Sequence, residues 1–169
     1  MDATALRDLQ APLKAKYREE PEAAVVTLKA EGDIDEAGIA CRIETGRALI
    51  EAGLHPATGG SGLEACSGDM LLEALVACAG VTLKAVATAL EFRLTGGHVR
   101  AEGDLDFRGT LGVDRTAPVG FRAIRLAFDL ATDEPPERLE TLLKLTERYC
   151  VVLQTLRGQP PIDARIARS

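Results

Sequence analysis

Residues 55–90, HPATGGSGLEACSGDMLLEALVACAGVTLKAVATAL, decide the fold of this chain. The stretch begins as a glycine-rich loop, and from Asp69 to Leu90 it predicts a long helix. Apolar residues occupy every side of this helix rather than one stripe, and such a helix is buried on every side. Glu73 and Lys84 lie inside the apolar run, so we interpret it as a core helix and not as a membrane span.

The length of the chain limits how that helix can be covered. A chain of 169 residues can place one small sheet and a few helices around it, which leaves part of its surface open. We therefore expect a second copy to cover the rest, in an intertwined homodimer. We interpret residues 1–169 as a single domain, in which residues 1–20 form a helical N-terminal arm.

Composition excludes several classes of function. The chain has 46% hydrophobic and 27% charged residues and a net charge of −6, so a nucleic-acid partner is not expected. The N-terminal residues do not combine a basic region, an apolar segment and a cleavage site, which predicts a cytoplasmic protein without a membrane partner. No CxxC pair is present and there are only two histidines, so we expect no metal or other cofactor. In a reducing cytosol the four cysteines are thiols.

The sequence before the core helix predicts strands. Residues 24–31 and 38–45 are strand-like and are separated by turn residues, which is typical of a hairpin. Residues 47–52 are a candidate for a third short strand. The loop at 55–68 is either a connector or a place where backbone approaches another chain or a ligand closely. It has no GxxxxGK[ST] pattern, which excludes a phosphate-binding P-loop.

After the core helix, residues 91–94, 98–107 and 119–132 read as strand segments, the last with strict alternation from Ile124. A second helix is predicted from a cap at Asp133 to about Cys150, with Cys150 on its apolar face. The tail at residues 160–167 is a candidate edge strand, where proline is tolerated.

Cys78 and Cys150 lie on the inner faces of the two predicted helices. They are the only group of residues for which the sequence suggests a chemical reaction. A Ser/His/Asp arrangement is not supported. Free cysteine is also a common core residue, so a purely structural role is an open alternative. Catalysis would need a lowered thiol pKa, because an ordinary thiol near pKa 8.5 is only about 3% thiolate at pH 7.

Few groups in the sequence could lower the pKa of such a thiol. Burial raises a thiol pKa, and Cys78 lies too far inside its own helix to feel that helix's dipole. We therefore expect a cation, with Arg42, Arg47 and Arg148 as candidates. Cys66 lies in the loop and is a candidate for a third redox-active thiol, whereas no role is assigned to Cys41.

The motif DMLLEALVAC, followed about seventy residues later by ERYCVV, resembles the OsmC/Ohr superfamily of thiol-dependent peroxidases. The resemblance covers about residues 24–166. It implies an α+β fold, with an antiparallel sheet wrapped around a long central helix in an intertwined homodimer. It also implies Cys78 as the peroxidatic cysteine and Cys150 as the resolving one. The implied substrate is an organic hydroperoxide, and the implied reductant is a dithiol, of lipoyl type or protein-bound, with no cofactor.

The sequence departs from the peroxidase pattern at two positions, and Ser67 stands at one of them, where the motif usually has proline. The family has a glutamate ten residues before the first cysteine, and this chain has Gly68 there. Asp69 is the nearest carboxylate, so Asp69, Arg42 and Arg47 are the candidates for orientation and charge. Loss of the glutamate favours an alternative hypothesis, in which the same dimer binds a small apolar or electrophilic ligand, or senses redox state, without catalysis.

Overall fold

The computed structural model describes residues 50–112 and 114–168 completely. For residues 32–34, 40–44 and 49 it describes the backbone, and near the N-terminus it describes residues 2–5, 7, 8, 10, 11 and 19. Residues 3–5, 7, 8, 10 and 11 are helical. The strand predicted at residues 24–31 lies outside the described residues.

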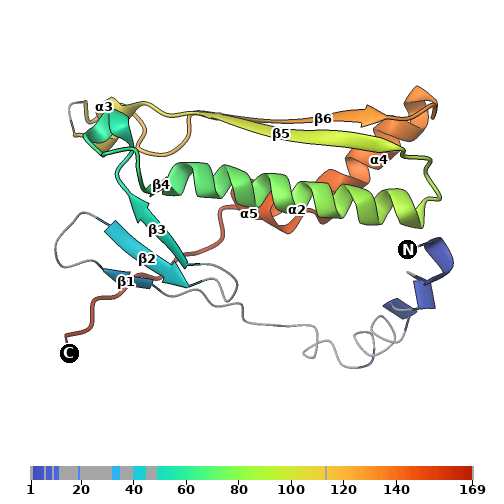
Figure 1. Ribbon diagram of the computed structural model, residues 1–169, viewed down its shortest axis with the longest axis horizontal. Coiled ribbons are helices and arrows are strands. Elements are labelled where there is room, and N and C mark those ends of the chain that lie inside the picture. Colours follow the sequence, from blue (N-terminus) through green and yellow to red (C-terminus); the bar gives the residue numbers. More distant parts are fainter. Residues whose placement is uncertain are drawn as a thin grey trace.

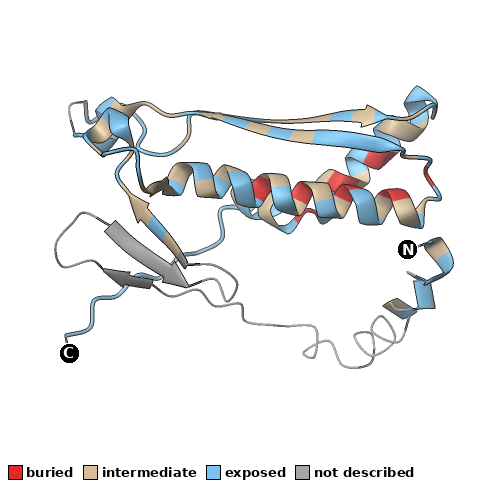
Figure 2. Cartoon of the chain, in the orientation of Figure 1, coloured by how far each residue is buried: buried red, intermediate tan, exposed pale blue. Residues whose placement is uncertain are grey.

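The longest element is α2, Ser67–Ala89, which runs through the middle of the structure (Figure 1). It confirms the predicted core helix and begins two residues earlier than expected. Its fully buried residues form a single stripe, four residues apart: Leu75, Ala79, Leu83 and Ala87. The opposite face is exposed within the chain, so one copy covers only part of this helix (Figure 2).

A two-stranded antiparallel sheet covers the buried stripe of α2. Strands β5, Gly96–Asp104, and β6, Ala123–Ala131, pair along their whole lengths. The inward-facing residues of both strands, Val99, Ala101, Ile124, Leu126 and Phe128 among them, pack against the helix. The outer face carries charged pairs such as Arg125 with Asp104, and that alternation is typical of a sheet with one solvated face.

Two consecutive helices cover another side of α2. Helix α4, Pro136–Tyr149, is followed directly by α5, Val151–Gly158, with Cys150 between them. Leu142 of α4 belongs to a core cluster around Leu83 and Phe92, whereas Cys150 belongs to a second cluster around Leu75 and Ala79. The core is therefore a row of contacts along one face of α2.

The N-terminal part of the described chain forms a second sheet, in the order β1-β2-β3-β4. Its strands are Gly32–Ile34, Ala40–Glu44, Leu49–Gly53 and Ala65–Cys66, and the last pairs in parallel with β3. Between β3 and β4 the glycine-rich loop contains a short 3-10 helix, η2, Pro56–Thr58. A Cβ on Gly60 would overlap the carbonyl group of Leu54, so the close approach predicted for this loop is to its own chain.

Several sequence predictions are corrected by the structure. Residues 32–34 form β1 rather than a turn, because they pair with residues 41–43 of the next strand. Residues 91–94 are not a strand, and residues 107–110 form a short helix, α3, Phe107–Thr110. The residue that caps α4 is Pro135 and not Asp133. The tail prediction is wrong: residues 159–168 have no regular structure, and Pro160 and Pro161 have no N–H to donate to a sheet.

A buried carboxylate joins three segments at the far end of α2. The Glu134 side chain is only 9% exposed and accepts hydrogen bonds from the Arg93 backbone N–H and from the Arg138 guanidinium, at 2.8 and 2.6 Å. Arg138 also donates to the carbonyl oxygen of Leu90, the residue after α2. Its guanidinium lies over the ring of Phe92, at 5.3 Å.

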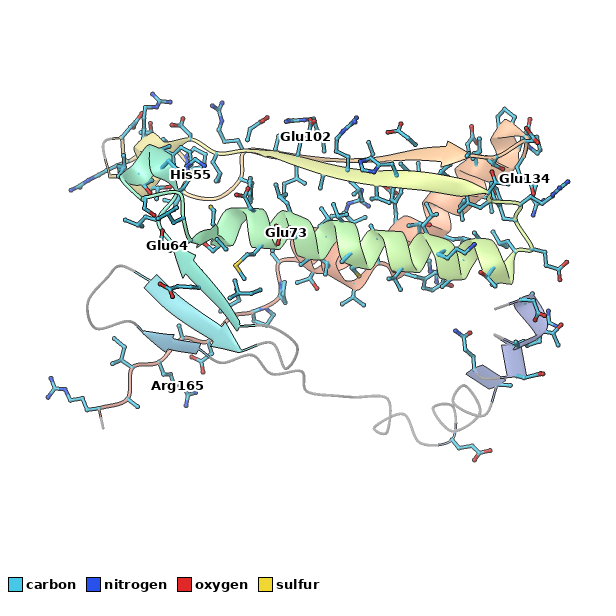
Figure 3. All side chains as sticks on the ribbon, in the orientation of Figure 1. His55, Glu64, Glu73, Glu102, Glu134 and Arg165 are labelled. Carbon is cyan, nitrogen blue, oxygen red and sulfur yellow. The ribbon has the colours of Figure 1, made fainter. Side chains whose placement is uncertain are left out.

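We expect the Glu134→Ala variant to lose about 1–3 kcal/mol of unfolding free energy, because it leaves a backbone donor and a guanidinium without their acceptor. Urea unfolding at one fixed protein concentration measures this loss. Glu102→Ala is the matched control, since Glu102 is 55% exposed and its ion pairs on the outer sheet face contribute about 0–1 kcal/mol (Figure 3). Equal losses in the two variants would contradict the prediction.

Candidate active site

The structure brings Cys78 and Cys150 together. Cys78 lies in the middle of α2, and Cys150 is the single residue that separates α4 from α5. Both are free thiols, and the Cys150 thiol hydrogen-bonds to the Cys78 sulfur. The two predicted helices therefore meet at the two predicted cysteines, which are the thiols of one hydrophobic cluster.

The break between α4 and α5 points a helix N-terminus at Cys78. Cys150 has an extended backbone, with φ −73° and ψ 107°, so that the chain starts a new helix at Val151. The free backbone N–H groups of Val151 and Val152 donate hydrogen bonds to the Cys78 sulfur. The first N–H groups of a helix lack partners within it and carry partial positive charge, so they favour a thiolate.

The pKa values of the two thiols are shifted in opposite directions because their surroundings differ. Burial by itself raises the pKa of Cys78, but hydrogen bonds from Val152, the Cys150 thiol, Val151 and the Thr82 hydroxyl outweigh it, and the pKa is lowered overall. Burial raises the pKa of Cys150, and the neighbouring Cys78 adds to that rise. Cys78 is partly exposed and Cys150 is fully buried. Cys78 is therefore the better nucleophile of the pair.

Among the described residues, the groups that donate to Cys78 are neutral. In the described ranges 50–112 and 114–168, no arginine or lysine is among the groups that lower its pKa. Arg148 is exposed beside the ring of Tyr149, at 5.6 Å. The backbone of Arg42 lies in β2, opposite Glu51, whereas its side chain and the whole of Arg47 lie outside the described residues. The roles predicted for Arg42 and Arg47 stay predictions.

The remaining candidates lie apart from the thiol pair within one chain. Asp69 is exposed in the first turn of α2 and is nine residues before Cys78, which places it on the opposite side of the helix. Cys66 is partly exposed and precedes α2, and its sulfur lies beside Gly68. Among the described residues, no three His, Cys, Asp or Glu side chains are grouped so that they could hold a metal ion.

Sequence reasoning missed Thr82 and the start of α5. Thr82 is four residues after Cys78, and that spacing places both side chains on one side of the helix, so the sequence contained the signal. The helix break at Cys150 had no such signal, because no glycine marks it and the only nearby prolines come after α5.

A cavity of about 360 Å³ lies beside the thiol cluster. Leu75, Leu153 and Leu156 line it from the helices, and Ile124, Leu126 and Phe128 line it from β6. Those same residues belong to the second core cluster, which also contains Cys78 and Cys150, although neither thiol lines the cavity. The ion pair between Arg157 and Glu147, at 3.0 Å, contributes its polar side.

The sequence profile of the family described as OsmC-like protein matches residues 60–165. The chain belongs to the OsmC-like family. The match includes α2, both thiols and the sheet that covers them, and the α+β fold predicted from the sequence is confirmed. No curated protein sequence matches this OsmC-like chain.

Solved structures agree on the fold. An OsmC-like protein from Mycoplasma pneumoniae has a TM-score of 0.64 and 16% identity, over 79% of this chain and 89% of that one. An organic hydroperoxide resistance protein from Legionella pneumophila has a TM-score of 0.63 and 19% identity, over 80% and 92%. The organic hydroperoxide resistance protein OhrB of Bacillus subtilis has a TM-score of 0.55 and 19% identity, over 80% and 93%.

We expect the Thr82→Val variant to alkylate more slowly at Cys78. Removing one hydrogen bond worth about 1 kcal/mol lowers the thiolate fraction roughly fivefold at a pH below the titration midpoint. Mass spectrometry of the Cys78 peptide after iodoacetamide treatment, over a range of pH, measures this, with the wild-type midpoint lying below that of an ordinary thiol. Thr82→Ser keeps the hydroxyl and is the control; a slow Ser variant and a fast Val variant would contradict the assignment.

Proposed function

We propose that this OsmC-like protein is a cysteine-based peroxidase that reduces organic hydroperoxides. The observation that carries the proposal is the pair of interacting thiols with opposite properties. One is partly exposed with a lowered pKa, and the other is buried with a raised pKa. A peroxidase with two cysteines needs that division, because one sulfur must attack as a thiolate while the other waits as a thiol.

In the first step, the Cys78 thiolate attacks the terminal oxygen of the hydroperoxide. The O–O bond breaks, the sulfur keeps the terminal OH group as a sulfenic acid, and the alkoxide leaves and takes up a proton to become an alcohol. The N–H groups of Val151 and Val152 hold the thiolate in place before the attack. The sulfur is oxidised by two electrons and the peroxide is reduced by two.

In the second step, the Cys150 sulfur attacks the sulfenic sulfur of Cys78. The S–O bond breaks, water leaves with the thiol proton of Cys150, and a disulfide forms between the two cysteines. A dithiol reductant, such as a lipoyl group, restores both thiols through two exchange steps and is itself oxidised to a disulfide. The hydrogen bond between the two sulfurs supports this step, because it requires no large movement.

Apolar surroundings support an organic peroxide as the substrate. The 360 Å³ cavity beside the thiol cluster combines apolar walls of leucine, isoleucine and phenylalanine with the polar side chains of Arg122, Glu147 and Arg157, and its apolar walls suit an alkyl chain. The solved structures of organic hydroperoxide resistance proteins share this fold. We place the protein in the cytoplasm, where thiols stay reduced.

A homodimer is part of the proposal. The exposed face of α2 includes Val81, which is 73% exposed, and a row of alanines along the same side. By length and composition this helix could also cross a membrane. A second copy explains the open face without placing Glu73 and Lys84 in lipid, where each charge would cost about 2.5–3.5 kcal/mol near the centre.

We expect wild-type protein to consume cumene hydroperoxide faster than H₂O₂ in the presence of dihydrolipoate. Cys78→Ser should abolish this activity, because an alcohol at that position is not a nucleophile at neutral pH. Cys150→Ser should turn over once and accumulate a sulfenic acid at Cys78, detected by dimedone labelling and mass spectrometry. Cys66→Ser is the matched control and should keep the wild-type rate.

The alternative function, binding of a small apolar or electrophilic ligand or redox sensing, is favoured by Gly68. The position has no carboxylate, and a Cβ there would meet only ordinary contacts at 3.6 Å with Cys66, Leu105 and Phe121. In this alternative, wild-type protein consumes peroxide no faster than free dihydrolipoate does. That result would contradict the peroxidase proposal, and the protein should then be tested for binding of small apolar or electrophilic ligands.

A further inference from the structure

The break at Cys150 moves a backbone donor from α4 to the thiol site. In a continuous helix, the Glu147 carbonyl oxygen would accept a hydrogen bond from the Val151 N–H, four residues later. The Val151 N–H donates to the Cys78 sulfur instead. The carbonyl oxygen of Glu147 therefore needs another donor, as do the last carbonyl groups of any helix.

Gln154 supplies that donor from the first turn of α5. Its side-chain Nε2 donates to the Glu147 carbonyl oxygen at 2.7 Å. Its backbone N–H donates to the Cys150 carbonyl oxygen at 2.9 Å, which closes the first turn of α5. One residue thus binds both the end of α4 and the residue that lies between the two helices.

A second side chain of α5 holds the same residue of α4. The Arg157 guanidinium donates to the Glu147 carboxylate at 3.0 Å. Arg157 lies three residues after Gln154, and this spacing places both on one side of α5. Helix α5 has eight residues, and an isolated helix of that length is unstable in water, so contacts with the rest of the chain hold it in place. Figure 1 shows α5 beside α2, the helix that carries Cys78.

Two acceptors compete for the Val151 N–H. One is the Glu147 carbonyl oxygen, its partner in a continuous helix, and the other is the Cys78 sulfur. The Gln154 amide already satisfies the oxygen, so the N–H gains less by returning to it. Without that amide, the oxygen would gain a hydrogen bond by extending α4 by one residue, at the expense of the thiol.

We propose that Gln154 is a positioning residue for Cys78. Its amide replaces the Val151 N–H at the Glu147 carbonyl oxygen, which leaves that N–H for the thiol. Arg157 supports this exchange by holding Glu147 against α5. The role deepens the proposed function and rests on it, because Cys78 is the nucleophile there, but the exchange of donors itself requires no peroxide.

Removal of the amide tests the role. Methionine resembles glutamine in size and helix propensity but has no N–H to donate. We expect Gln154→Met to raise the pH midpoint of Cys78 alkylation and, below that midpoint, to slow alkylation about fivefold, the effect of one lost hydrogen bond. Mass spectrometry of the Cys78 peptide after iodoacetamide treatment measures both. Gln159→Met, the same exchange at the residue after α5, is the matched control and should keep the wild-type midpoint.

The midpoint separates positioning from a general effect on packing. Of the described groups that shift the pKa of Cys78, Cys150 is the only titratable one, and its own pKa is raised, so the two titrations stay apart. A substitution that merely loosened the packing would expose Cys78 and speed its alkylation at high pH, where the thiol is fully ionised. That result with an unmoved midpoint, or a profile identical to wild type, would overturn the proposal.

Amide NMR signals follow the donor itself. In wild type, the Val151 signal should shift with pH at the midpoint of Cys78, because that N–H donates to the sulfur. In Gln154→Met this shift should be much smaller, because the N–H then donates to the Glu147 oxygen. Cys78→Ser is the control that removes the titrating group. An unchanged Val151 titration in Gln154→Met would contradict the proposed exchange of donors.

Peroxide consumption by the same samples separates this proposal from the proposed function. A raised midpoint in Gln154→Met, together with a wild-type protein that consumes no peroxide, would support the positioning role and reject the enzyme. An active peroxidase whose midpoint is the same with and without Gln154 would keep the enzyme and reject the positioning role.

Discussion

The structure depends on a helix that is apolar on more sides than its own chain can cover. The sheet β5–β6 and the helices α4 and α5 bury one stripe of α2, and the far side stays open. Burial of apolar surface is the main favourable term in folding, so the rest of the chain packs on this helix. The part of its apolar surface that the chain leaves open favours a further contact. The same helix carries Cys78, which packs in the cluster of the buried residues Leu75 and Ala79.

The second constraint is the single residue between α4 and α5. Cys150 ends one helix and begins the next, and this break places its own thiol and two free N–H groups around Cys78. One backbone feature thus supplies both a neighbouring sulfur and the groups that stabilise a thiolate. Burial raises the pKa of both thiols; at Cys78 the donated hydrogen bonds outweigh it, whereas at Cys150 the hydrogen bonds from Leu153 and Val152 do not.

The sequence predicted elements whose periodicity is long and regular. The long apolar run predicts helix α2, and regular spacing over nine or more residues predicts the strand β6 and the helix α4. The short strand β1 was not predicted, since three residues containing glycine and aspartate read as a turn until their partner strand is known. Helix α5 was missed because Val151 and Val152 continue the apolar pattern of α4 across the break.

The chemistry of the site also depends on contacts between distant segments, which the sequence does not predict. The sequence predicts that the two cysteines lie on the inner faces of two helices, but it points to cations as the source of thiolate stabilisation and not to the start of another helix. Among the described residues, the donors come from the start of a helix about seventy residues later and from Thr82, one turn away. Neutral donors stabilise a thiolate through geometry rather than net charge, so they hold it only while the break at Cys150 keeps its shape. A carboxylate at position 68 would hold a cation, and Gly68 cannot do so. The hydrogen bonds that Cys78 receives from the described residues do not involve this position.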